Sequence, residues 1–286
     1  MWIVFSFASA MFAGVVAILA KCGIKNTDSN VATALRTIVV LIFSWVMVFV
    51  AGSQSEITQV DAKTFSFLIL SGLATGASWL CYFKALQLGD VNKVAPIDKS
   101  STILTMILAI IFLHEGMTWI KAAAILFIAV GTFFMIEKKK SDAGKKIDRK
   151  WMIYAFASAI FASLTSILGK VGIEGIDSTL GTAIRTVVVL VMAWVVVFVT
   201  KKQHTIKKID KTSWLFITLS GFATGGSWLC YYRALQTGPA SAVVPIDKLS
   251  ILITIAFAYI VFHEKLSKKS ALGLLLIVVG TLAMLL

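Results

Sequence analysis

Residues 71–99 read SGLATGASWLCYFKALQLGDVNKVAPIDK, and residues 220–248 read SGFATGGSWLCYYRALQTGPASAVVPIDK. The two stretches are identical at 19 of 29 positions and lie 149 residues apart. The same offset of 149 residues aligns the rest of the chain without a gap, so that Trp2 meets Trp151. An offset that holds from end to end indicates an internal duplication of the whole chain.

The duplication divides the chain into a first half at 1–137 and a second half at 151–286. Residues 138–150 form a basic, hydrophilic linker between them. The segment FASAMFAG near the N-terminus resembles a signal-peptide cleavage site, but no basic region precedes it and FASAIFAS repeats it at 156–163. We therefore expect a repeated membrane helix there and not a leader that is removed.

The composition indicates a membrane protein. The mean hydropathy is +0.90 and only 14% of the residues are charged, which lies outside the range of soluble domains. A helix that crosses a bilayer needs about 20 mostly apolar residues, and the runs here do not alternate as barrel strands would. We expect ten spans, at 2–20, 31–51, 65–87, 94–113, 117–136, 151–169, 180–200, 213–236, 243–262 and 268–286.

Five spans in each half is an odd number, so the second half must enter the membrane upside down relative to the first. The expected fold is an all-α membrane protein with ten transmembrane helices in two inverted five-helix repeats. Inverted repeats recur in secondary transporters, where the substrate site lies at the repeat interface near the middle of the bilayer.

Loop charge gives an expected orientation. Lysine and arginine concentrate in the loops after the odd-numbered spans, with seven in the linker region 137–150, five in 201–211 and three in 264–269. The positive-inside rule then makes the linker cytoplasmic and both termini external. The expected location is a multi-pass protein of the cell membrane, in a bacterial or archaeal plasma membrane.

Other classes of function find no support in the sequence. The net charge of +13 is explained by these loops, so no nucleic-acid partner is expected. Cys22, Cys81 and Cys230 lack metal-ligand spacing and are read as free thiols. The His114–Glu115 and His263–Glu264 pairs lack the second histidine of a zinc protease, and no phosphate-binding loop is present. We expect no metal, no cofactor and no enzymatic activity.

These features together resemble the drug/metabolite transporter superfamily, specifically a pair of EamA-type repeats. The resemblance rests on the two five-helix halves, the GLATGASWLCYFKAL third span, the PIDK opening of the fourth and the HE that closes it. It implies a ten-helix transporter of small metabolites, often an exporter of amino acids, with spans 1–4 and 6–9 around a central cavity. Members of this kind usually keep both termini cytoplasmic, whereas the loop charge here argues the reverse.

The third span of each half carries a small-xxx-small pattern, Gly72 with Gly76 and Gly221 with Gly225, which allows two helix backbones to approach closely. We expect these glycines to pack helices. Threonine and aromatic residues share the same helical face. They are expected to line the substrate cavity or, alternatively, to lie in the aromatic belt at the membrane surface: Thr75, Trp79, Tyr82, Thr224, Trp228 and Tyr231.

Charged residues inside a span cost roughly 3 kcal/mol or more on insertion scales, so they normally face the protein interior with a partner. Under the inverted arrangement, one face of the membrane gathers Lys21, Arg36, Lys84, Asp98, Lys99 and Glu264. The opposite face gathers Lys170, Arg185, Arg233, Asp247, Lys248 and Glu115. Asp98 and Asp247 are expected about one turn into their helices, just after a proline suited to a first turn.

Two related clusters are what two alternating gates require, because one network closes while the other opens. The alternatives are that these residues only anchor the helices in register, or that they contact substrate or a proton directly. The excess of basic residues favours a cargo that carries a carboxylate, although lysine snorkelling explains part of the same excess.

The function that the sequence favours is secondary transport of a small polar metabolite, an amino acid or related compound and more specifically its export, with the charge clusters as gates. A proton or another ion is a possible coupling partner, and the lipid bilayer is the surrounding solvent. Efflux of drugs or organic cations by the same fold is the alternative. A membrane enzyme, a lipid-handling protein and a channel are less favoured, and the oligomeric state is open.

Overall fold

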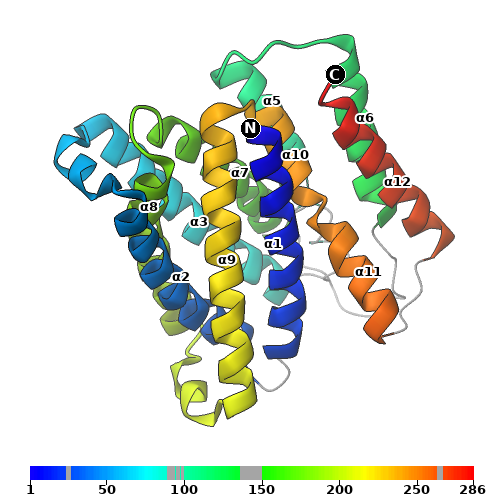
Figure 1. Ribbon diagram of the computed structural model, residues 1–286. Helices are drawn as coiled ribbons and strands as arrows, with labels where there is room; N and C mark the ends of the chain where they lie inside the picture. Colours follow the sequence, from blue (N-terminus) through cyan, green and yellow to red (C-terminus); the bar gives the residue numbers. More distant parts are fainter. Residues whose placement is uncertain (24–26, 89–93, 95–96, 98–99, 136–149, 263–266) are drawn as a thin grey trace.

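The computed structural model describes residues 1–23, 27–88, 94, 97, 100–135, 150–262 and 267–286 (Figure 1). These residues form helices and turns, with no strand among them. In the first half the helices are α1 (Trp2–Gly23), α2 (Ser29–Ala51), η1 (Ser53–Gln59), α3 (Ala62–Leu88), α5 (Ser101–Phe112) and α6 (Trp119–Met135). In the second half they are α7 (Lys150–Gly172), α8 (Ser178–Val199), η2 (Gln203–Lys208), α9 (Lys211–Thr237), α10 (Ala240–Lys248), α11 (Ser250–Phe262) and α12 (Lys268–Ala283).

Six stretches of the described helices are long and apolar enough to cross a membrane: Trp2–Leu19, Ser29–Ala51, Ala62–Tyr82, Lys150–Gly172, Ser178–Val199 and Ala240–Phe257. The shorter helices α5 and α6 are apolar as well. The predicted helical membrane fold is confirmed at this level, and the count of ten spans stays a prediction. α9 was expected to span and is not among the six, because serine, threonine and glycine line its buried face and lower its apolar content.

Apolar side chains cover much of the outside of the molecule. Phe49 of α2, Phe112 of α5 and Phe133 of α6 are all more than 60% exposed. Soluble proteins rarely leave so many large apolar groups in contact with water. These outward faces therefore fit a surrounding of lipid tails.

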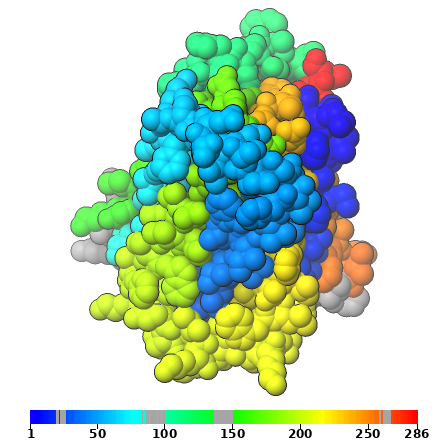
Figure 2. Space-filling model, turned by 60° about the vertical axis from the view of Figure 1, so that its left-hand side comes forward, coloured from blue at the N-terminus to red at the C-terminus, as the bar shows by residue number. Residues whose placement is uncertain are grey.

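The two halves interlock through their core helices. α1 packs along α9, α3 packs along α7, and α2 packs against α8, so that each pair takes one helix from each half. Figure 2 shows the side where α2 and α8 meet. Trp2 lies against Gly238 and Ser9 bonds Ser227, so α1 and α9 run antiparallel. Figure 1 shows α3 and α9, which are equivalent under the 149-residue offset, running in opposite directions.

Glycines permit close contact between these helices at equivalent places in the two halves. A β-carbon on Gly72 of α3 would lie 2.7 Å from Cβ of Val188 in α8. A β-carbon on Gly221 of α9 would lie 2.6 Å from Cβ of Val39 in α2. One turn further on, Gly76 lies against Met192 and Gly225 lies against Phe43. The two pairs place the backbones of α3 and α9 directly on α8 and α2.

An aspartate caps the start of α2, and an aspartate caps the start of α8 in the same way. The Asp28 carboxylate accepts hydrogen bonds from the N–H groups of Asn30 and Val31, and Asp177 does the same at the start of α8. Such side chains satisfy amide groups that have no partner inside the helix. Past the other end of α2, Gly52 adopts a left-handed conformation with φ 73°, which glycine allows without steric cost.

The PIDK motif of the second half lies near the end of a helix and not at its start. The expectation of a helix start near residue 243 is wrong, because α10 begins at Ala240, directly after Pro239. Pro245 lies inside α10 and Asp247 lies near its end. The helix is interrupted at Leu249, whose N–H bonds the carbonyl of Ile246, before α11 continues at Ser250. Pro245 has no N–H and so cannot bond the carbonyl of Ser241 four residues before it, which weakens α10 on the side away from Leu249.

Gly72→Val should destabilise the protein, because the added methyl groups would overlap Val188. Overpacking of this kind costs about 1–3 kcal/mol, so the thermal unfolding midpoint of the detergent-purified protein should fall. Gly116→Val is the matched control, because a β-carbon at Gly116 would meet nothing within 4 Å. Equal midpoints for the two variants would contradict the close contact between α3 and α8.

Candidate functional site

A carboxylate, an ammonium group and a helix start meet at the end of the molecule that carries both chain termini (Figure 1). The Glu115 carboxylate accepts hydrogen bonds from the N–H groups of Ala240 at 2.6 Å and Ser241 at 2.9 Å. Lys170 Nζ lies 3.2 Å from Glu115 Oε1 and donates to the Gly238 carbonyl at 2.6 Å. We call these five residues the Glu115 latch, which joins Glu115 of the first half to four residues of the second.

The latch arises because the turn between α9 and α10 lacks a cap of its own. Pro239 stands at the N-cap of α10 and makes no side-chain hydrogen bond to the helix. The first amide groups of a helix have no partner within it and carry a partial positive charge. Glu115 supplies the missing acceptor from the other half, and Lys170 bonds a carbonyl at the end of α9.

The end of α5 directs Glu115 toward this turn. His114 follows the helix in a left-handed conformation with φ 52°, which turns the chain sharply. The N–H of Glu115 returns to the Ala109 carbonyl at 3.4 Å. The side chains of Glu115 and Lys170 are 9% and 20% exposed, so water screens their contact only in part.

Glu115 lies outside the membrane-spanning segments, and its pKa is held below the ordinary value of 4.5. Burial alone would raise this pKa. The hydrogen bonds from Ser241 and Ala240 and the charge of Lys170 outweigh the burial, because they stabilise the ionised carboxylate. Glu115 is therefore charged at neutral pH.

Arg185 forms a second polar site, deeper in the molecule. Its side chain rises from α8 and is 2% exposed. Nε donates to the Ser71 hydroxyl at 2.9 Å, and Nη2 donates to the Thr75 hydroxyl at 2.6 Å. The guanidinium carbon lies 5.2 Å from the ring centre of Trp228 and 5.0 Å from that of Tyr232. Two hydroxyls and two aromatic faces thus surround the buried cation.

Asp247 forms a third site where α10 ends. Its carboxylate accepts a hydrogen bond from the Ser9 hydroxyl of α1 at 2.6 Å. Lys248 Nζ lies 3.3 Å from its other oxygen. Ser9 also bonds the Ser227 carbonyl at 3.0 Å, so Asp247 is tied to the contact between α1 and α9.

The structure divides the six residues that were expected to cluster on this face. Glu115 and Lys170 share the latch, Arg185 has its own surroundings, and Asp247 with Lys248 lies at the interruption of the helix. Arg233 is 3.9 Å from Asp177 and bonds Gln236, a contact within the second half. Within the described residues the six groups lie in four places and not in one network.

Much of the set expected on the opposite face lies outside the described residues, namely Asp98, Lys99, Glu264 and the side chain of Lys21. Lys84 is exposed near the end of α3. Arg36 is half-buried in α2. Whether this set acts as a gate stays a prediction.

The residues expected in the cavity fall around these sites. Thr75 and Trp228 contact Arg185, and the Tyr231 hydroxyl lies 2.8 Å from that of Ser166. The Thr224 hydroxyl donates to the Ser220 carbonyl of its own helix at 2.7 Å. Trp79 and Tyr82 pack on two different apolar clusters, next to α2 and α7 respectively. Their role in binding cargo stays a prediction.

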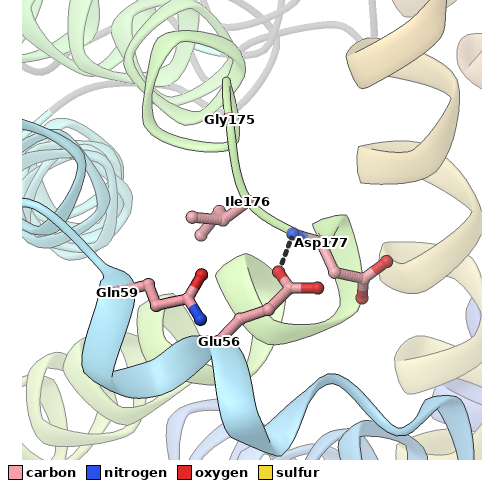
Figure 3. Close-up of a pocket in the computed structure, with 5 residues that line it drawn as sticks. All are labelled: Glu56, Gln59, Gly175, Ile176 and Asp177. Atoms are coloured by element: carbon pink, nitrogen blue, oxygen red, sulfur yellow. Dashed lines mark hydrogen bonds between the residues drawn. The ribbon is translucent and has the colours of Figure 1, made fainter.

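An open hollow of about 400 Å³ lies between η1 and the turn from α7 to α8 (Figure 3). Glu56 accepts a hydrogen bond from the N–H of Asp177 there at 2.7 Å. The hollow opens at the end of the helices and not beside Arg185 or Asp247, so we assign no cargo site to it. Its lining comprises Glu56, Gln59, Gly175, Ile176 and Asp177.

Sequence reasoning missed the serines that join the halves. Ser9 and Ser227 exchange hydrogen bonds with each other's backbone carbonyls, and Ser78 and Ser158 do the same between α3 and α7. Ser71 bonds both Arg185 and the Thr165 carbonyl. The signal was available, because Ser9 matches Ser158 and Ser78 matches Ser227 under the 149-residue offset.

The comparisons with known proteins agree with a transporter. The profile of the EamA-like transporter family matches residues 1–137 and 149–286. An uncharacterized transporter of Sinorhizobium sp is 42% identical over 136 residues, which cover 48% of this chain and 96% of that relative. An S-adenosylmethionine uptake transporter of Rickettsia bellii is 25% identical, over 75% of this chain and 70% of its own length. A protein of known crystal structure superposes with a TM-score of 0.73 at 14% identity, over 99% of this chain and 96% of its own, which shows the fold alone.

Glu115→Gln should lower the stability of the protein at neutral pH by about 1.5–3 kcal/mol, the usual contribution of hydrogen bonds to a charged group. The pKa of Glu115 is depressed, so the stabilisation is complete above about pH 5. It is lost as the pH falls below 4.5 and through the lower pKa of the folded state. Thermal unfolding of wild type and variant as a function of pH measures this, and the two curves should converge in acid.

Glu174→Gln is the control for the same measurement, because Glu174 is exposed. That variant should follow the wild type at every pH. A difference between Glu115→Gln and wild type that stayed constant down to pH 3 would show that the charge of Glu115 does not stabilise the latch.

Proposed function

We propose that this chain, which belongs to the EamA-like transporter family, is a secondary transporter that works by alternating access. Its cargo is a small polar metabolite, an amino acid or a related compound, and the direction is export across a bacterial cell membrane. The observation that carries the proposal is the Glu115 latch, a polar contact between the two halves at one end of the helices. In this proposal the latch is the gate of that end, and it is formed in this conformation.

The repeat supplies the second gate. The 149-residue offset takes Glu115 to Glu264 and Lys170 to Lys21. In this proposal these equivalents provide the residues for a corresponding latch at the opposite end, in the other conformation. The Glu115 latch consists of hydrogen bonds and one partly exposed ion pair, which are individually modest in free energy. One latch can therefore part as the other forms, without a large barrier to the rocking of the halves.

α10 connects the latch to the middle of the protein. Its first amide groups are held by Glu115, and its other end carries Asp247, which Ser9 of α1 holds. The helix between them is short and ends at an interruption, which is where a helix bends most easily. Release of Glu115 frees one end of α10 and lets it turn about Leu249. Movement at the gate is thereby transmitted to the contact between α1 and α9.

A second candidate cargo is S-adenosylmethionine, moved inward. The observation in its favour is the name of the Rickettsia relative, an S-adenosylmethionine uptake transporter. Both candidates are small polar compounds that carry an amino group and a carboxylate. They differ in size, in the sulfonium charge and in the direction of transport.

Counterflow in proteoliposomes tests the proposed function. Vesicles loaded with an unlabelled amino acid or with S-adenosylmethionine should accumulate the labelled compound, with saturable uptake stimulated by the internal pool. Vesicles that hold the Glu115→Ala protein should show exchange reduced about tenfold or more, because one gate cannot close. Saturable exchange of none of these compounds would overturn the proposal, and uptake that rises linearly with concentration would indicate a channel.

Asp247→Asn should reduce exchange about tenfold while the protein still purifies as a folded membrane protein. The amide oxygen can still accept from Ser9, but the negative charge beside Lys248 is gone. Asp98→Asn, the equivalent change in the first half, should act in the same way. Asp61→Asn at the exposed start of α3 is the control and should leave exchange intact. Normal exchange by both Asp98→Asn and Asp247→Asn would exclude a role of these carboxylates in gating.

A further inference from the structure

Arg36 and Arg185 occupy equivalent positions but have different surroundings. They are 149 residues apart, and each lies about two turns into its helix. The Arg36 carbonyl would lie 3.1 Å from a β-carbon on Gly221, and the Arg185 carbonyl 3.2 Å from one on Gly72. Their backbones therefore sit on the two halves in the same way. Any difference between the two side chains reflects their neighbours.

Protein groups contact most of the Arg185 guanidinium, and Nη1 is buried without a partner among the described residues. The hydroxyls of Ser71 and Thr75 accept its hydrogen bonds, and the rings of Trp228 and Tyr232 cover its faces. With 2% of its surface exposed, it has no access to solvent or to a solute. It is a structural cation in this conformation.

Arg36 lacks such a surrounding. In the part of the chain that the structure describes, its guanidinium has no hydrogen bond, ion pair or aromatic contact, and the side chain is only half-buried. The equivalent hydroxyls do not accept from Arg36. Ser220 donates to the Ile217 carbonyl of its own helix at 2.8 Å, whereas Ser71 donates to the Thr165 carbonyl of the other half. Thr224 donates to the Ser220 carbonyl at 2.7 Å, as Thr75 does to the Ser71 carbonyl, but only Thr75 also accepts from an arginine.

The sequence differs between the halves at the same place. Tyr232, which covers Arg185, is replaced by Phe83, and Ser166, the partner of Tyr231, is replaced by Ala17. Thr165, whose hydroxyl lies 3.3 Å from that of Thr75, is replaced by Val16. Each change removes a side-chain hydroxyl from the first half. The chain itself therefore differs between the halves, because three hydroxyls found at or next to the Arg185 site have no counterpart in the first half.

A guanidinium inside a membrane-spanning helix that has no partner in the protein requires water or an anion. Its planar pair of N–H donors matches a carboxylate in a bidentate geometry. We propose that Arg36 is the group that binds the carboxylate of the cargo, while Arg185 keeps its structural role. This inference rests on the proposed function, because it names the substrate class of that transporter: small metabolites with a free carboxylate.

Chemical labelling tests the difference between the two arginines without any transport. Phenylglyoxal modifies accessible, unpaired guanidinium groups, and mass spectrometry of the protein in nanodiscs locates the product. Arg36 should be modified at least about tenfold faster than Arg185. L-leucine, L-glutamate or S-adenosylmethionine should slow the modification of Arg36, whereas L-leucinamide, which has no carboxylate, should not. Equal rates at Arg36 and Arg185, or no slowing by any carboxylate, would overturn the inference.

Binding measurements on variants give the second test. A carboxylate ligand should raise the unfolding temperature of the wild type by mass action. Arg36→Gln should abolish this rise and increase the KM of exchange about tenfold or more, and Arg36→Lys should restore part of both because it keeps the charge. If the ligand raised the unfolding temperature of Arg36→Gln as much as that of the wild type, the inference would be overturned, whatever the effect on exchange. Binding that depends on Arg36 without any exchange would instead overturn the proposed transport function.

Discussion

A charged group inside a membrane-spanning helix must be solvated by the protein itself or by water that the protein admits. This constraint organises the structure described above. Two hydroxyls of α3 and two aromatic rings of α9 surround the charge of Arg185. The charge of Asp247 is stabilised by a hydroxyl of α1 and by the neighbouring Lys248. Each solution draws partners from both halves of the chain, so the charges that are costly in lipid also hold the halves together.

The same constraint explains why the contact at the end of the helices is suited to moving. Glu115 and Lys170 bond backbone groups at the turn between α9 and α10, where water can replace either of them when the halves separate. A buried ion pair without access to water would cost too much to open. The α9–α10 turn combines a helix end that needs an acceptor with an acidic residue from the other half. It is thus a contact that can form in one conformation and be replaced by water in another.

The sequence was sufficient for the helical membrane fold and for part of the site. Helical membrane segments follow from the length of the apolar runs, and the repeat follows from the 149-residue offset. Glu115 and Lys170 were placed on the same face because the inverted arrangement brings their helix ends together. The predicted start of α10 near residue 243 is wrong, because two prolines lie six residues apart and the helix begins after the first, Pro239, and not at Pro245. The surroundings of Arg185 depend on how α3 and α9 pack, and a hydropathy pattern carries no information about that packing.

We propose above all that the Glu115 latch holds one end of the protein closed and opens during transport. The distance between spin labels on Met117 of the first half and Glu174 of the second measures this most directly once Cys22, Cys81 and Cys230 are replaced. Both positions are exposed, and they follow Glu115 and Lys170 by two and four residues in the sequence. A short distance should dominate in the wild type, and Glu115→Gln should shift the population toward a longer one. A distance distribution that neither Glu115→Gln nor transported cargo changes would contradict the account.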